Sequence, residues 1–123
     1  MIKLDINKIM LGSPPPLEYQ VTLENWRTYP YNIWSFVNVR SVIPTSPIKS
    51  DPKQKICLNK KLIDLNELKI THNNSKKKLK EILINCNTDS LLVMHKGILV
   101  FEYFNNFTAY NTPHIIFSIS KSL

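Results

Sequence analysis

A serine and a lysine near the end of this sequence have a spacing that supports acyl-transfer chemistry. Ser118 and Lys121 are three positions apart, and residues with this separation share one face of a helix, where hydroxyl and amine can converge. The serine supplies a nucleophile, and a lysine that burial keeps neutral can accept its proton. One large class of acyl-transfer enzymes uses this S-x-x-K spacing. Ser118 and Lys121 are therefore the candidate catalytic residues.

The spacing alone carries little weight in a sequence so rich in serine and lysine. Ten serines and fourteen lysines among 123 residues give about one S-x-x-K match by chance. Four matches are present: Ser46 to Lys49, Ser50 to Lys53, Ser75 to Lys78, and Ser118 to Lys121. Prolines interrupt the first two, which indicates turns, and Ser75 is better explained as the N-cap of a helix. Among these four serines, only Ser118 follows an apolar run, residues 115–117, and such a run can desolvate a lysine. The alternative to a catalytic interpretation is a buried strand that ends at the polar start of a helix.

Length and composition indicate one small domain. The chain has 123 residues, of which 43% are apolar, enough for a core. Cys57 and Cys86 stand far apart in the sequence, and we expect two buried free thiols in a reducing compartment. The histidines have no metal-ligand spacing, and no apolar run is long enough to span a membrane. The N-terminus does not resemble a signal peptide, so a cytoplasmic location is expected.

The net charge of +7 raises the question of a nucleic-acid partner. Fourteen of the sixteen basic residues are lysines, whereas base recognition and bidentate phosphate contacts favour arginine. The densest cluster, Lys76–Lys78 with Lys80, contains no interleaved aromatic residue for base stacking. We expect this cluster to be the solvated face of one short helix. No specific nucleic acid and no membrane partner are expected.

The first half of the chain predicts little regular structure. Residues 1–16 end in Gly-Ser-Pro-Pro-Pro and are expected to form an extended leader without a core role. Residues 17–48 are rich in proline and in aromatic residues, namely Trp26, Tyr29, Tyr31, Trp34 and Phe36. Such rings anchor an irregular segment on another surface. Packing against the protein's own body is the preferred interpretation, and a ligand-stacking platform is the alternative.

The second half predicts a loop, a helix and a hairpin. Residues 49–61 are polar and lysine-rich, which indicates a surface loop. Ser75 is expected to cap a helix that runs to about Ile84, with the apolar stripe Leu79, Ile82 and Leu83. Two strand-like runs, residues 90–94 and 98–103, flank His95-Lys96-Gly97, which is typical of a β-hairpin with glycine at the turn.

The order of these features resembles a known enzyme superfamily. The hairpin sequence H-K-G-I-L-V-F-E-Y is followed by Thr112-Pro113 and then by F-S-I-S-K-S-L. This arrangement resembles the serine hydrolases of the penicillin-recognising, β-lactamase-like superfamily, and above all its 6-aminohexanoate-dimer hydrolase-like branch. Earlier segments extend the resemblance over about residues 11–123: G-S-P-P-P, V-T-L-E-N-W, W-S-F with Val39-Arg40, Ile43-Pro44-Thr45, and Thr88-Asp89.

The resemblance implies a reaction and an α+β fold. Ser118 corresponds to the acylated nucleophile and Lys121 to the lysine that activates it, while the backbone N–H of Ser118 helps to form an oxyanion hole. The implied reaction is hydrolysis of a small-molecule amide or ester through an acyl-enzyme, with no metal or organic cofactor. The implied fold is a partial β-lactamase/transpeptidase-like domain over residues 17–123, comprising the aromatic-rich segment, one short helix, the hairpin and the start of the nucleophile helix.

Two further motifs of the superfamily are not placed in this sequence. One is Tyr-x-Asn or Ser-x-Asn, and the other is a Lys-Thr-Gly-like strand. Tyr103 and Tyr110 precede the nucleophile and take neither role. We therefore expect an N-terminal fragment that ends at its S-x-x-K motif and is inactive alone. The alternatives are half of a split hydrolase complemented by a separate C-terminal chain, and a repurposed basic binding module.

Overall fold

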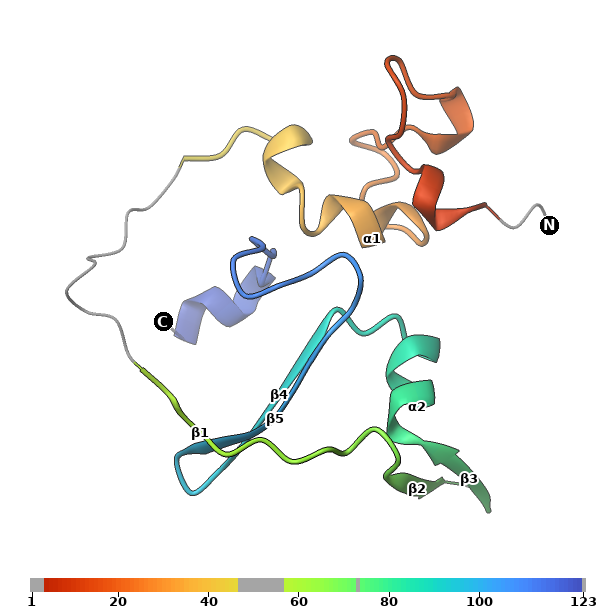
Figure 1. The fold of residues 1–123 in the computed structure, drawn as a ribbon. Coiled ribbons are helices and arrows are strands. Elements are labelled where there is room, and N and C mark those ends of the chain that lie inside the picture. The colour runs from red at the N-terminus through yellow and green to blue at the C-terminus, as the bar shows by residue number, and fades with distance from the viewer. Residues whose placement is uncertain (1–3, 47–56, 73, 123) are drawn as a thin grey trace. The chain divides into compact units, whose positions relative to one another are not determined.

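The computed structural model describes residues 4–46, 57–72 and 74–122 (Figure 1). The chain forms two compact units. The first unit comprises Met1–Ile48 with Tyr110–Leu123, and the second comprises Lys49–Ala109. Helices and strands both occur, as expected for an α+β fold.

Short helices joined by turns make up the first unit. They are η1 (Ile6–Lys8), η2 (Leu17–Tyr19), α1 (Tyr31–Ser35), η3 (Val39–Ser41) and η5 (Phe117–Ser122). All except α1 are 3₁₀ helices, which are usually brief because their hydrogen bonds are poorly aligned. The irregular character predicted for residues 17–48 is therefore confirmed over residues 17–46, and residues 47 and 48 lie outside the described residues.

The core of the first unit includes a residue from the expected leader. Ile9 is only 5% exposed, alongside Trp26 and Ile33. The Met10 N–H donates a hydrogen bond to the Tyr19 carbonyl at 3.0 Å, so the proline-rich segment folds back on itself. The expectation that residues 1–16 have no core role is thus wrong at Ile9, because the chain reversal carries this apolar side chain inside.

The predicted hairpin is confirmed in the second unit. Strand β4 (Ser90–His95) pairs antiparallel with β5 (Ile98–Phe104). Lys96 and Gly97 connect them with φ of 49° and 77°, the left-handed pair that a tight two-residue turn requires. Leu99 and Phe101 of β5 are buried. A β-bulge lies between these two residues, so the regular alternation of faces is interrupted there.

A third strand joins this sheet on the other side of β5. Strand β1 (Asn59–Lys60) pairs parallel with β5, giving the order β1-β5-β4. The Lys61 N–H then donates to the Leu99 carbonyl at 3.0 Å. The surface loop predicted over residues 49–61 is wrong at β1, because backbone pairing needs no apolar alternation in the sequence. Residues 49–56 of that prediction lie outside the described residues.

The predicted helix starts later than expected. Ser75 belongs to strand β3 (Ser75–Lys78), which pairs antiparallel with β2 (Lys69–His72), and α2 spans Leu79–Asn85. The predicted N-cap at Ser75 and the helical placement of Lys76–Lys78 are both wrong, because the pairing with β2 holds these residues extended. The apolar stripe of α2 is confirmed, with Leu83 buried and Leu79 and Ile82 half-buried. Across the described ranges, no helix is long and apolar enough to cross a membrane.

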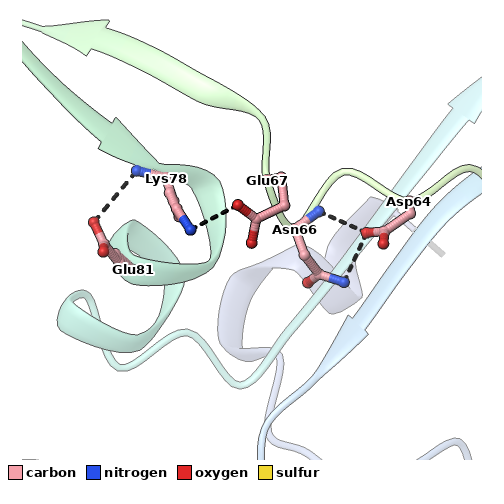
Figure 2. Close-up of polar contacts among 5 residues, drawn as sticks. All are labelled: Asp64, Asn66, Glu67, Lys78 and Glu81. Atoms are coloured by element: carbon pink, nitrogen blue, oxygen red, sulfur yellow. Dashed lines mark hydrogen bonds and ion pairs between the residues drawn. The ribbon is translucent and has the colours of Figure 1, made fainter.

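Lys78 is the junction between β3 and α2 (Figure 2). Its backbone N–H donates to Glu81 Oε2 at 3.3 Å, which caps the first turn of the helix. Its Nζ lies 2.6 Å from Glu67 Oε2. The hydrogen bond to Glu67 and the charge of its carboxylate raise the pKa of Lys78 above its usual 10.5. The lysine cluster is therefore partly neutralised by acidic residues.

The two cysteines differ from expectation in burial. Cys57 and Cys86 are free thiols, but both are exposed. Cys86 terminates α2, where its N–H donates to the Ile82 carbonyl at 2.9 Å. The prediction that both thiols are buried is wrong, since the buried face of α2 is its Leu79–Leu83 stripe.

Candidate active site

The helix η5 brings Ser118 and Lys121 together. Lys121 Nζ donates a hydrogen bond to Ser118 Oγ at 3.1 Å. A 3₁₀ helix has three residues per turn, so positions i and i+3 are aligned. Ser120 faces a different partner, since its Oγ donates to the Phe117 carbonyl at 2.6 Å. The pair converges as the spacing predicted, while its catalytic role stays a prediction.

The other S-x-x-K matches do not form such a pair within the described ranges. Ser75 and Lys78 lie on strand β3, where residues three apart point to opposite faces, and Lys78 binds Glu67 instead. The matches at Ser46 and Ser50 include lysines outside the described residues. Secondary structure thus separates Ser118 from Ser75, although the two share one sequence spacing.

Aromatic packing attaches η5 to the rest of the first unit. The Phe117 ring stacks on Trp26, with ring centroids 6.5 Å apart and planes inclined by 20°. It also meets Phe36 edge-on, at 5.3 Å and 76°. The Ile115 N–H donates to the Phe36 carbonyl at 2.9 Å. The interpretation that the rings of residues 17–48 pack against the protein's own body is confirmed for Trp26 and Phe36, whereas Tyr29 is 60% exposed.

Phe117, the residue before the serine, has an unusual backbone conformation. Its φ of 44° lies in the left-handed region, where a bulky side chain crowds the neighbouring backbone. Sequence reasoning treated Phe117 only as part of an apolar run and missed both its strain and its ring partners. No local signal announces either feature, because both depend on residues far away in the sequence.

The electrostatics of the pair are those of a solvated site. Ser118 and Lys121 are both exposed, as are the neighbouring apolar side chains Ile116, Phe117 and Ile119. In the described part of the chain, residues 115–117 therefore do not bury Lys121. The lysine donates to the serine, whereas a general base must accept the hydroxyl proton.

The described residues hold no group of three or more His, Cys, Asp and Glu side chains that could bind a metal ion. The chemistry available at this site is that of a hydroxyl, an amine and backbone N–H groups. A hydroxyl beside an amine at the start of a helical turn is suited to acyl transfer. The hairpin, the short helix and the Ser118–Lys121 pair together resemble part of a β-lactamase-like hydrolase.

Comparisons with known proteins point to the same class. The 6-aminohexanoate-dimer hydrolase of Paenarthrobacter ureafaciens is 28% identical over 103 residues, which cover 83% of this chain and 24% of that protein. A solved structure of the same name from Bacillus anthracis matches with a TM-score of 0.67 and 32% identity, over 76% of this chain and 24% of that one. No protein-family model matches the chain.

These matches confirm the resemblance to 6-aminohexanoate-dimer hydrolase and the partial character of the fold. The chain spans about a quarter of the length of both relatives. Both relatives contain a further part that this chain does not span. We call that part, and its counterpart for this chain, the remainder of the domain.

Proposed function

We propose that this chain is the N-terminal part of a serine hydrolase that cleaves an amide or ester bond through an acyl-enzyme. The observation that carries the proposal is the 3.1 Å hydrogen bond between Lys121 Nζ and Ser118 Oγ. The names of both relatives describe hydrolysis of the 6-aminohexanoate dimer, which supports an amide substrate. The substrate of this protein is then a small molecule with such a bond.

The proposed reaction has two halves. Ser118 Oγ attacks the carbonyl carbon while its proton passes to Lys121 Nζ, and backbone N–H groups, including that of Ser118, stabilise the oxyanion. Collapse of this intermediate breaks the bond to the leaving amine or alcohol, which takes the proton from Lys121. Water then attacks the acyl-enzyme and releases the acid, which regenerates Ser118. The steps need no metal and no organic cofactor.

The proposal requires the remainder of the domain, either in the same polypeptide or as a second chain. Lys121 is exposed, and a lysine becomes a useful base near neutral pH only when burial disfavours its charged form. Among the described strands, β4 has one neighbour, β5, and its other edge is open. Leu92 and Met94 of β4 are 48% and 51% exposed. An open, apolar edge strand favours pairing with a further strand, which supports the need for the remainder of the domain.

The basic binding module has less support. Lys76 and Lys77 are exposed on β3, but Lys78 is paired with Glu67. The paired charge leaves a smaller positive patch than the sequence suggested. Salt-sensitive binding of a polyanion by the isolated chain, lost in Lys76→Ala/Lys77→Ala, is the result that would favour this module over the hydrolase.

A fluorophosphonate probe tests the proposed hydrolase directly, because it labels only an activated serine. The chain is assayed alone and with the remainder of the domain, taken from the reading frame after Leu123 or from a separate gene. We expect labelling only in the mixture, lost in Ser118→Ala and retained in the matched control Ser120→Ala. If the mixture is still labelled when the chain carries Ser118→Ala, the proposed role of Ser118 is refuted. The absence of labelling in every mixture refutes it as well.

A further inference from the structure

Three aromatic rings connect the candidate nucleophile to a distant part of the sequence. We call Trp26, Phe36 and Phe117 the aromatic clamp. The ring of each is close to those of the other two: Phe117 lies on Trp26 and Phe36 as described above, and Trp26 meets Phe36 edge-on at 6.4 Å and 78°. Edge-on and offset contacts at these separations are favourable arrangements for aromatic pairs. The clamp therefore restrains the Phe117 ring from two directions.

Phe36 holds the segment before Ser118 by its backbone as well as by its ring. Its carbonyl accepts the Ile115 N–H at 2.9 Å, and its ring meets His114 edge-on at 6.2 Å. Residues 114, 115 and 117 are thus all attached to one residue. This set of contacts ties the segment before Ser118 to Phe36.

The base of the clamp lies in the buried core of the first unit. Trp26 is 6% exposed, and Ser35, next to Phe36 in the sequence, is fully buried. The Ser35 hydroxyl donates to the Trp26 carbonyl. Two of the three clamp rings are therefore carried by segments that a buried hydrogen bond joins, so the clamp has a fixed base.

A left-handed backbone at a bulky residue persists only where its surroundings impose it, and such strain clusters at functional sites. The Phe117 φ of 44° occurs immediately before Ser118. Rotation about the N–Cα bond of Phe117 changes the direction in which η5 leaves the segment 114–116. It therefore changes where the hydroxyl and N–H of Ser118 point relative to the first unit.

We propose that the aromatic clamp imposes the left-handed conformation of Phe117 and thereby orients Ser118, which makes Trp26 and Phe36 positioning residues. The catalytic part of this inference rests on the proposed hydrolase, while the conformational part does not. Misplacing a nucleophile by about 1 Å lowers a rate by up to about a hundredfold. Loss of a clamp ring should therefore slow acylation without weakening the initial binding of a probe.

The test compares Phe36→Leu, Phe36→Tyr and the matched control Phe107→Leu. Phe107 belongs to the second unit and is 41% exposed. Fluorophosphonate labelling of the chain with the remainder is followed over a range of probe concentrations. We expect Phe36→Leu to reduce the saturating rate at least about tenfold with the half-saturating concentration unchanged. Phe36→Tyr keeps the ring and should restore the rate to within about twofold, and Phe107→Leu should leave it unaltered.

A second readout separates the clamp from the proposed function. In the same mixtures only the 123-residue chain is isotope-labelled, so that NMR detects this chain alone. The one-bond Cα–Hα coupling of Phe117 then reports the sign of its φ. We expect positive φ in the wild type and Phe36→Tyr, and its loss in Phe36→Leu. A negative φ of Phe117 in the wild type overturns the proposed role of the clamp. So does a Phe36→Leu variant in which both this φ and the labelling rate are unchanged. Positive φ with no labelling of the wild type supports the conformational part and counts against the hydrolase.

Discussion

Lys121 donates a hydrogen bond to Ser118 across one turn of η5, with 3.1 Å between Nζ and Oγ. The direction of this bond is the reverse of the one that catalysis needs, because a general base receives the serine proton. Both side chains of this pair are exposed. In the proposed hydrolase, burial by the remainder of the domain favours the neutral amine and reverses this bond.

Replacing Lys121 with arginine should separate charge from basicity. Arginine keeps the positive charge but does not lose its proton in proteins, so Lys121→Arg should lower fluorophosphonate labelling of the chain with the remainder by about a hundredfold or more. The side chain is exposed, so the free energy of unfolding should change by less than about 0.5 kcal/mol. Labelling at the wild-type rate would show that Lys121 is not the base.

The open edge of β4 should be needed for complementation. Leu92 is 48% exposed, so Leu92→Lys should cost the chain little stability by itself, while a charge on an edge strand opposes strand pairing. We expect binding of the remainder, measured by calorimetry, to weaken at least about tenfold, which corresponds to about 1.4 kcal/mol. Leu17→Lys is the matched control because Leu17 is 84% exposed in the first unit. Equal effects of the two substitutions would argue against pairing at β4.

Two substitutions at Phe117 should differ according to backbone strain. Both Phe117→Gly and Phe117→Ala remove the ring, but glycine adopts a φ of 44° without a steric penalty whereas alanine does not. Labelling should therefore decrease in both variants and remain several-fold faster in Phe117→Gly. Identical rates would mean that the left-handed conformation has no part in orienting Ser118.

The Glu67–Lys78 pair should affect stability in a pH-dependent way. Since Glu67 raises the pKa of Lys78, its stabilising effect is fully present below the usual pKa of 10.5 and is lost as pH rises through the raised value. The unfolding curves of wild type and Glu67→Gln should differ slightly at neutral pH and converge in strong alkali. The Lys78 ammonium, followed by nitrogen NMR, should titrate at lower pH in Glu67→Gln; an unchanged midpoint would contradict the contact.

Local patterns were sufficient for the hairpin and for the apolar face of α2. Continuous apolar runs on either side of His95-Lys96-Gly97 predicted β4 and β5, and the apolar stripe that includes Leu83 predicted a helix. The prediction of an N-cap at Ser75 was wrong. A serine before a lysine run resembles an N-cap, but pairing with β2 overrides that preference. Strand β1 could not be predicted from the sequence, because a two-residue parallel pairing leaves no periodic pattern of apolar residues.

The sequence by itself determined the spacing of Ser118 and Lys121, their place after an apolar run, and the resemblance to 6-aminohexanoate-dimer hydrolase. Spacing is a local property, so it is readable without a fold. The tertiary structure alone decided that Ser118 and not Ser75 meets its lysine, and that Phe117 is held left-handed before it. For Phe117 the partners are the rings of Trp26 and Phe36, far away in the chain, whereas for Ser75 the partner is the neighbouring strand β2. In both cases backbone or ring pairing, which forms only when the chain folds, decides the outcome.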